Sequence, residues 1–397
     1  MLVNNITELI EKNHPELIRI RRQLHQNPEL SFKEYNTTNF IADYLEKLGF
    51  EVLRPLETGC LAVIEGSTNS KRVIALRADI DALPIEEEGD YKQSFKSQTP
   101  GVAHCCGHDI HTTNLLGTAK ILSELKGHID GKIILIFQAG EEKLPGGGRL
   151  LSETGILQKL GVQTVYGLHT DPRFKPGQIA LKEGPLMARP DEFELKILGK
   201  GGHAAAPHTT VDPIVLAAQV VGAIQTIVSR SVDPTDPAVV TIGKIEGGSA
   251  HNVISSKVTM LGTIRTFDKK ISELISERIE SIASGITKSA GGDYEFFYNK
   301  GYPAVINTLD TTQNVIETAE QFPNTEVIEL NKPVMAGEDF AFYQQHFPGT
   351  FFFLGSGSEE TESIYSWHHP KYNADEESMK TGVSVMVGLA LNLNKTS

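Results

Sequence analysis

The stretch IILIFQAGEE, residues 133–142, places five consecutive apolar residues shortly before two glutamates. A short apolar run of this kind is typical of a buried strand. Similar runs occur at 61–64, 73–76 and 165–168, and a helical pattern of apolar residues covers about 112–125. Strands that alternate with helices predict an α/β fold with a central, mostly parallel sheet flanked by helices. The catalytic residues of such a fold are expected at the carboxyl ends of its strands.

The segment that follows Arg189 has a different pattern. Its expected elements follow the order β-α-β-β-α-β, at residues 193–198, 211–228, 239–242, 257–264, 271–286 and 294–298. This order is that of a ferredoxin-like α+β unit. The α/β pattern resumes after Pro303. We therefore expect a discontinuous catalytic domain at 1–186 and 304–397, interrupted by an inserted domain at 187–303.

Composition narrows the class of protein. The 397 residues carry 37 Lys and Arg against 50 Asp and Glu, a net charge of −13, which gives no basic surface for nucleic acid or for an anionic membrane. The three cysteines are an odd number and two of them are adjacent, which argues against a disulfide framework. The first residues lack a signal-peptide core, so a cytoplasmic enzyme is expected.

Side chains that bind metals gather at the expected strand ends. Cys106 and His108 lie in the segment HCCGHDIH, residues 104–111, and thiolates and imidazoles are the usual ligands of zinc. Glu142 and His169 follow apolar runs, and His368 lies near the C-terminus. These five candidates exceed what a single ion with an open position needs, and they would suit two ions about 3.5–4 Å apart. The alternative for each cluster alone is a buried thiol, a capping histidine or a solvated turn.

Further residues have supporting roles in this hypothesis. Neighbouring side chains on an extended segment point to opposite sides, so Glu141 is displaced from the metal if Glu142 binds it, and it can act as a general base. Asp79 and Asp81 share one face, and one of them could orient a ligand histidine; a loop-capping role is the alternative for Asp79. In the inserted domain, His203 and Arg265 could hold an oxyanion or a substrate carboxylate.

Taken together, these motifs resemble one known family. The segments that carry the resemblance span nearly the whole chain: LHQNPELS (24–31), RADIDALP (77–84), HCCGHDIHT (104–112), EE (141–142), GLH (167–169), GKGGH (199–203), NVI (252–254), EDF (338–340) and HHP (368–370). The chain resembles the two-metal aminoacylase/carboxypeptidase metallopeptidases. Within them it is similar to the amidohydrolase branch of hippurate hydrolases, N-acetyl-amino-acid deacetylases and auxin–amino-acid conjugate hydrolases.

The resemblance implies a set of roles. The implied ligands of two divalent ions, Zn²⁺ or Mn²⁺, are Cys106, His108, Glu142, His169 and His368. Glu141 is the implied base, and His203 lies in a lid that dimerises, with Asn252 a weaker candidate for the same pocket. The implied activity is therefore the hydrolysis of small N-acyl amino acids. The alternatives are a dipeptidase or aminopeptidase, or a non-catalytic protein that binds metals or amino acids.

The chain departs from the family pattern at a few positions. Cys105 and Ile110 replace the usual Ala and Gly, and Ala139-Gly140 replaces Pro-Ala before the paired glutamates. None of these changes removes an implied ligand. A disulfide between Cys105 and Cys106 would remove one, so oxidative inactivation is a further hypothesis.

Overall fold

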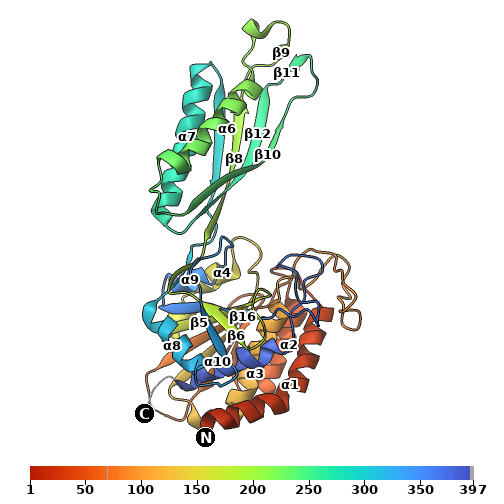
Figure 1. Cartoon of the computed structure of the whole chain (residues 1–397), viewed down its shortest axis with the longest axis vertical. Coiled ribbons are helices and arrows are strands. Elements are labelled where there is room, and N and C mark those ends of the chain that lie inside the picture. The colour runs from red at the N-terminus through yellow and green to blue at the C-terminus, as the bar shows by residue number, and fades with distance from the viewer. Residues whose placement is uncertain (69, 394–397) are drawn as a thin grey trace. The chain divides into compact units, whose positions relative to one another are not determined.

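The computed structural model describes residues 1–68 and 70–393, which form two compact units (Figure 1). The first unit comprises Met1–Leu186, Ile306–Pro333 and Asp339–Ser397, and the second comprises Met187–Val305 and Val334–Glu338. The second unit thus includes a short segment beyond the expected 187–303. This segment returns to the start of the second unit, where the amide of Ala188 donates to the Val334 carbonyl at 3.1 Å.

An eight-stranded mixed sheet organises the first unit. Its strands, in spatial order, are β1 (Glu51–Leu53), β2 (Cys60–Glu65), β4 (Lys132–Gln138), β3 (Val73–Asp79), β5 (Thr164–Asp171), β16 (Gly349–Gly355), β6 (Gln178–Leu181) and β15 (Glu326–Glu329). The central pairings β4–β3, β3–β5 and β5–β16 are parallel. β2, by contrast, is antiparallel to β4. The α/β class with a mostly parallel centre is confirmed.

Helices cover this sheet. They are α1 (Leu2–Gln26), α2 (Tyr35–Lys47), α3 (His108–Glu124), α4 (Gly147–Glu153), α5 (Ile156–Lys159), α8 (Leu309–Ala319), α9 (Ala341–Gln344) and α10 (Ser378–Leu391). Helices α1, α3 and α10 pack against one another, and α3 also packs on β3. α3 begins at His108, four residues before the expected start, because its first turn is polar and does not continue the apolar pattern.

The core of the first unit lies between the sheet and its helices. Strand residues such as Leu135 and Phe352 meet helix residues such as Leu116 and Val383, all at 0% exposure. Both β3 and β16 are buried along their whole length, as expected of strands covered on both faces. The carboxyl ends of β3, β4 and β5 therefore form a rigid base for the residues that follow them.

The second unit is a four-stranded antiparallel sheet with two helices. Its strand order is β10 (Ala238–Gly247), β12 (Lys257–Thr266), β8 (Arg189–Leu198) and β13 (Asp293–Asn299). α6 (Pro213–Arg230) and α7 (Lys269–Ser289) lie on one face, where Leu195, Val220 and Ile275 are buried in a separate core. Along the chain these elements follow the expected order β-α-β-β-α-β.

The remaining elements are short. They are β7 (Gly184–Met187), β9 (Gly202–His203), β11 (Val253–Ile254), β14 (Val305–Asn307) and the 3-10 turns η1 (Lys126–His128) and η2 (Pro207–Thr209). Within the described ranges, α6 alone is long and apolar enough to cross a membrane by length and composition, a test that core helices of soluble proteins also pass. Its residues Leu216, Val220 and Ile224 are buried on the sheet.

Candidate metal centre

All five sequence-predicted ligands lie in the first unit. Cys106 and His108 flank the start of α3, Glu142 follows β4, His169 lies within β5, and His368 is in the segment before α10. Gly107, between the first two, has φ +89°, and a Cβ there would lie 2.3 Å from Thr170 Oγ1. Only glycine permits this backbone approach, which brings the start of α3 against β5.

The ligand atoms form two groups that share Cys106. Cys106, His108 and His169 offer atoms within 4.8 Å of one another, as do Cys106, Glu142 and His368. Cys106 Sγ is 3.3 Å from His169 Nε2, and His368 Nε2 is 3.1 Å from Glu142 Oε1. A thiolate between two groups of nitrogen and oxygen ligands is a donor set that suits two divalent cations.

His108 carries a buried nitrogen that is available to a ligand. Its Nδ1 is 3.2 Å from Asp81 Oδ1, while its Nε2 makes no hydrogen bond to any residue in the described ranges. Burial lowers the pKa of His108, but the carboxylates of Asp79, Asp81 and Glu142 outweigh burial and raise that pKa to about 10. The surroundings therefore favour positive charge beside Nε2, and a metal cation would supply it there.

His169 is held in the opposite charge state. Its Nδ1 lies 2.8 Å from the Thr170 carbonyl, so Nδ1 donates and Nε2 faces Cys106 with its lone pair. Burial, followed by repulsion from His111, holds the pKa of His169 well below its usual range. A neutral imidazole with a free Nε2 is the form that binds metals.

Glu141 and Glu142 have different surroundings. The Glu142 amide donates to Asp81 Oδ2 at 3.0 Å, while Glu141 is 7% exposed and its Oε1 accepts the Asp339 amide at 3.4 Å. Glu141 also lies within the same 4.8 Å group as His108 and Glu142. Both carboxylates can therefore face the metal-binding space from one turn.

That turn is shaped by a contact that spacing alone does not reveal. Gly140 has φ +65°, and a Cβ there would lie 2.3 Å from the Phe32 ring. Glu34 Oε1 accepts the amides of both Phe32, at 2.9 Å, and Gly140, at 2.8 Å. Burial, together with the charge of Asp81, raises the pKa of Glu34 to about 7. Glycine at position 140 is thus required by the Phe32 ring.

The two aspartates of the RADID segment point to different partners. Asp81 accepts from Ser31 Oγ at 2.7 Å as well as from the Glu142 amide, and it contacts His108. Asp79 Oδ2 accepts from Arg77 at 2.7 Å, and its Oδ1 is 2.6 Å from His111 Nδ1. Asp81 therefore hydrogen bonds to an implied ligand, whereas Asp79 hydrogen bonds to His111 and lies 3.8 Å from His108 Nε2 as an ion-pair partner.

The other three predicted residues belong to the second unit. His203 and Asn252 are neighbours on the β9–β11 pair, where the Ala204 amide donates to the Asn252 carbonyl at 3.1 Å. Both side chains are exposed. Arg265 lies near the carboxyl end of β12 and donates to Thr263 Oγ1 and to the Ile264 carbonyl. Of these three predicted residues, the structure thus places His203 and Asn252 side by side.

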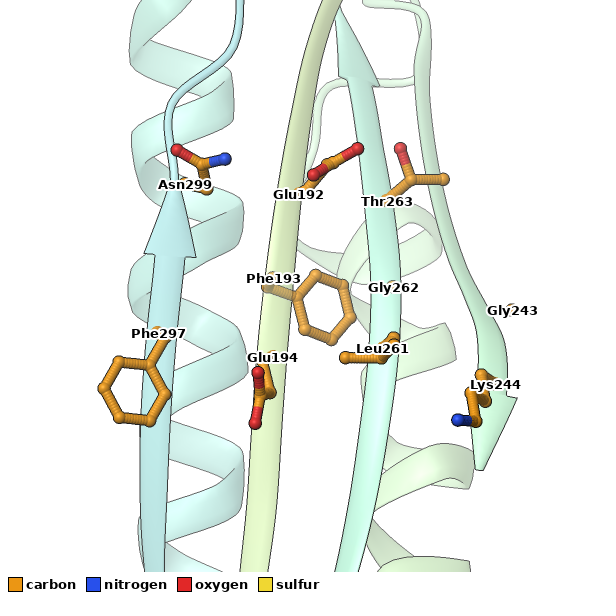
Figure 2. A pocket seen from close by; sticks show the side chains of 10 residues that line it. All are labelled: Glu192, Phe193, Glu194, Gly243, Lys244, Leu261, Gly262, Thr263, Phe297 and Asn299. Atoms are coloured by element: carbon orange, nitrogen blue, oxygen red, sulfur yellow. The ribbon is translucent and has the colours of Figure 1, made fainter. Parts of the chain in front are cut away.

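A hollow of about 480 Å³ lies on the face of the second unit's sheet that α6 and α7 leave open (Figure 2). Glu192, Glu194, Leu261 and Phe297 are among its lining residues. None of the predicted site residues lines it.

Several contacts of the centre were not assigned from the sequence. Ser31, His111 and Asp339 all hydrogen bond to site residues or to their partners. Each of the three lies inside a segment that carries the family resemblance, and this position was the only sign in the sequence that the residue belongs to the site. Their partners are distant in the chain, so spacing could not assign the contacts.

Comparison with known proteins identifies the family. The model of Peptidase family M20/M25/M40 matches residues 75–392. The chain belongs to this family. The match includes all five candidate ligands and Glu141, and it also covers the second unit.

Similar proteins of known name support this membership. The chain is 39% identical over 386 residues to the N-acetylcysteine deacetylase of Bacillus subtilis, covering 96% of this chain and 98% of that protein. It is 44% identical over 308 residues to the N-acyl-L-amino acid amidohydrolase of Geobacillus stearothermophilus, covering 77% and 82% of the two chains. The crystal structure of the B. subtilis YXEP protein, described as a dinuclear metal-binding M20 peptidase, superposes with a TM-score of 0.84 at 35% identity, covering 98% of this chain and 100% of that one.

Proposed function

We propose that this protein hydrolyses the amide bond of small N-acyl amino acids with the help of two divalent cations. The observation that carries the proposal is the buried carboxylate of Glu141 beside two groups of metal-binding side chains that share Cys106. The names of the similar deacetylase and amidohydrolase support the class of bond and substrate.

The residues that would hold the ions are Cys106, His108, Glu142, His169 and His368. Bound there, divalent ions lower the pKa of a water molecule and polarise a carbonyl group. Cysteine favours zinc, while the carboxylate and the imidazoles also accept manganese, so Zn²⁺ and Mn²⁺ are the proposed cofactors. The uncommitted Nε2 of His108 and the neutral imidazole of His169 support this assignment.

Glu141 is the proposed general base. It would take the proton of the attacking water and deliver it to the departing amine. Asp81 would hold the Nδ1–H of His108, so that Nε2 faces the metal. His203 is proposed to contact the developing oxyanion, Asn252 to bind substrate in the same pocket, and Arg265 to contact the substrate carboxylate.

The second unit is proposed to act as a lid and as a dimerisation domain. This proposal rests on the family resemblance together with the exposed position of His203, which leaves the side chain available to a substrate or to a second subunit. Light scattering of the purified protein tests it, and a monomer would count against it. The three free cysteines fit the proposed cytoplasmic location.

A substrate panel tests the reaction class. N-acetyl, N-benzoyl and N-succinyl amino acids would be compared with free-amine dipeptides, together with metal analysis of the purified protein. We expect turnover of the N-acyl compounds. Cleavage of the dipeptides alone would favour a peptidase instead, and tight metal binding without any turnover would favour a binding protein.

Replacing Glu141 tests the mechanism. Glu141→Ala should lower kcat by about 10²–10⁴-fold, because general-base catalysis is lost, and leave the metal content near that of the wild type. Glu153→Ala, at an exposed glutamate on α4, is the control and should keep the kcat and the metal content of the wild type. Wild-type turnover by Glu141→Ala would refute the assignment of the base.

A further inference from the structure

We infer that His111 is a positioning residue for His169 and not a metal ligand, an inference that rests on the proposed metal centre. His111 is the obvious rival ligand, because Asp79, His108 and His111 form another group with atoms within 4.8 Å. It lies one helical turn from His108 on α3 and is 1% exposed. Its hydrogen bonds decide between the two roles.

Both ring nitrogens of His111 are already used. Nε2 accepts the backbone amide of Thr170 at 2.8 Å, and Nδ1 lies 2.6 Å from Asp79 Oδ1. A backbone N–H can only donate, so Nε2 presents its lone pair to Thr170 and the ring proton is on Nδ1. The lone pair that a metal would need is therefore committed to the backbone of β5.

The sheet explains why Thr170 needs this acceptor. The parallel pairing of β3 with β5 runs from Ile74 opposite Thr164 to Arg77 opposite Gly167 and stops there, although β5 continues to Asp171. Beyond that point no strand of the described residues pairs with β5 on its β3 side. The His111 ring occupies this position and replaces the missing carbonyl for a buried amide, which would otherwise be costly to leave unpaired.

The backbone carbonyl of Thr170 in turn fixes His169. The Thr170 carbonyl accepts from His169 Nδ1 at 2.8 Å and from Trp367 Nε1 at 2.7 Å, and the Trp367 ring lies 4.9 Å from the His169 ring. The Thr170 N–H belongs to the peptide that follows His169, and the Thr170 carbonyl belongs to the next peptide, so both meet at Thr170. A rotation of the backbone at Thr170 would therefore move the carbonyl that holds the His169 imidazole facing Cys106. His111 acts on the metal site through the backbone of this one residue.

Asp79 is itself held from the far side. Arg77 donates to Asp79 at 2.7 Å and to Asp339 at 2.8 Å, and Gln138 donates to the same Asp339 carboxylate at 2.8 Å. All of these side chains are at most 2% exposed. The chain of contacts links the ends of β3, β4 and β5, so it is rigid enough to define one orientation for His111.

Two substitutions at position 111 separate the contacts. His111→Gln places an amide oxygen near the position of Nε2 and keeps an acceptor for Thr170, whereas His111→Asn keeps a donor for Asp79 and loses that acceptor. His14→Gln is the matched control, because His14 is a buried histidine of the same unit whose Nε2 lies 3.2 Å from the Glu376 carbonyl. Metal-free protein would be titrated with Zn²⁺, with bound zinc counted at saturation.

We expect all three variants to bind as many zinc ions at saturation as the wild type. His111→Asn should bind them about 10–100-fold more weakly, the usual effect of removing a partner of a ligand, and His111→Gln should lose much less. Loss of one zinc ion at saturation in both His111 variants would show that His111 is a ligand and overturn the inference.

The emission of Trp367, the single tryptophan in the sequence, gives a readout that needs neither metal nor activity. In metal-free protein it should change in His111→Asn, because the Thr170 carbonyl that the indole contacts moves, and stay unchanged in His14→Gln. Wild-type emission and wild-type zinc affinity in both His111 variants would reduce His111 to a space-filling residue and overturn the inference. A wild type that binds neither zinc nor manganese would refute the proposed function, while the emission measurement would still test the role of His111.

Discussion

His108 and His111 lie one helical turn apart on α3, yet their hydrogen bonds give them different chemistry. His108 Nε2 has no hydrogen-bond partner among the described residues, whereas His111 Nε2 accepts a backbone amide. One histidine therefore has a nitrogen available to a metal, while the other, three positions further on, hydrogen bonds to the backbone beside a candidate ligand. This difference arises from the backbone that each ring faces and not from the local sequence.

Gly107 offers a test of how closely α3 must approach β5. Gly107→Ala should lower the free energy of unfolding by more than the roughly 1–2 kcal/mol that a left-handed alanine costs, because its Cβ would overlap Thr170 Oγ1 and Tyr372 Oη. Gly101→Ala is the matched control, since Gly101 has φ +71° but no atom within 4 Å. Urea unfolding measures both, and equal losses would show that overlap contributes nothing.

Cys105 bears on the hypothesis of oxidative inactivation. Both Cys105 and Cys106 are free and buried. Burial raises the pKa of the Cys105 thiol to about 12, so little thiolate forms near neutral pH. Since the thiolate is the reactive form, we expect disulfide formation with Cys106 to be slow in the folded protein.

The long connection between β3 and α3 is held by buried charges. Lys92, at 1% exposure, contacts Glu87 Oε1 at 2.7 Å and donates to the Tyr372 carbonyl at 2.6 Å. His25 of α1 contacts the same Glu87 oxygen at 2.7 Å. These contacts tie the connection to the segment that carries His368, whose amide donates to the Cys105 carbonyl at 2.8 Å.

Removing the charge of Lys92 should therefore be costly. Lys92→Met should lower the free energy of unfolding by about 3–5 kcal/mol, because it leaves buried Glu87 with only part of its compensation. Lys120→Met removes a partly exposed lysine that is 3.3 Å from Glu124, and it should cost less than about 1 kcal/mol. Similar losses in the two variants, measured by urea unfolding, would argue against a structural role for the buried group.

The two units bury separate hydrophobic clusters, and the candidate ligands belong to the first unit. We expect calorimetry to resolve two unfolding transitions. Chelation of the metal with EDTA should lower the midpoint temperature of the first unit's transition only. Binding at 100 times the dissociation constant stabilises a fold by about 2.7 kcal/mol, and chelation removes this term. An equal shift in the midpoint temperature of the second unit's transition would contradict the assignment of the metal ligands to the first unit.

Acid should destabilise the protein through carboxylates that are paired in the fold. Burial raises the pKa of Glu87, but the hydrogen bond with His25 and the charge of Lys92 outweigh burial and lower that pKa from 4.5 to about 2. Its contribution to stability is therefore present above about pH 4.5 and is lost as the pH falls towards 2. The difference in unfolding free energy between wild type and Glu87→Gln should shrink over this interval, and a constant difference would refute the pKa assignment.

The sequence by itself determined the α/β class, the β-α-β-β-α-β order of the second unit and the candidate ligands. Apolar runs identify buried strands, and ligand-type residues just after them lie at one edge of a parallel sheet. Such reasoning depends on neighbours in the chain. It therefore placed the start of α3 too late, since the first turn of that helix is polar.

Only the tertiary structure decided which side chains serve the ligands. The partners of His111 are 32 and 59 positions away along the chain, and Gly140 is required by the ring of Phe32, more than 100 positions before it. Whether a histidine nitrogen is available to a metal depends on where β3 and β5 stop pairing. Hydrogen bonds between distant strands settle that point, and the local pattern of residues does not contain them.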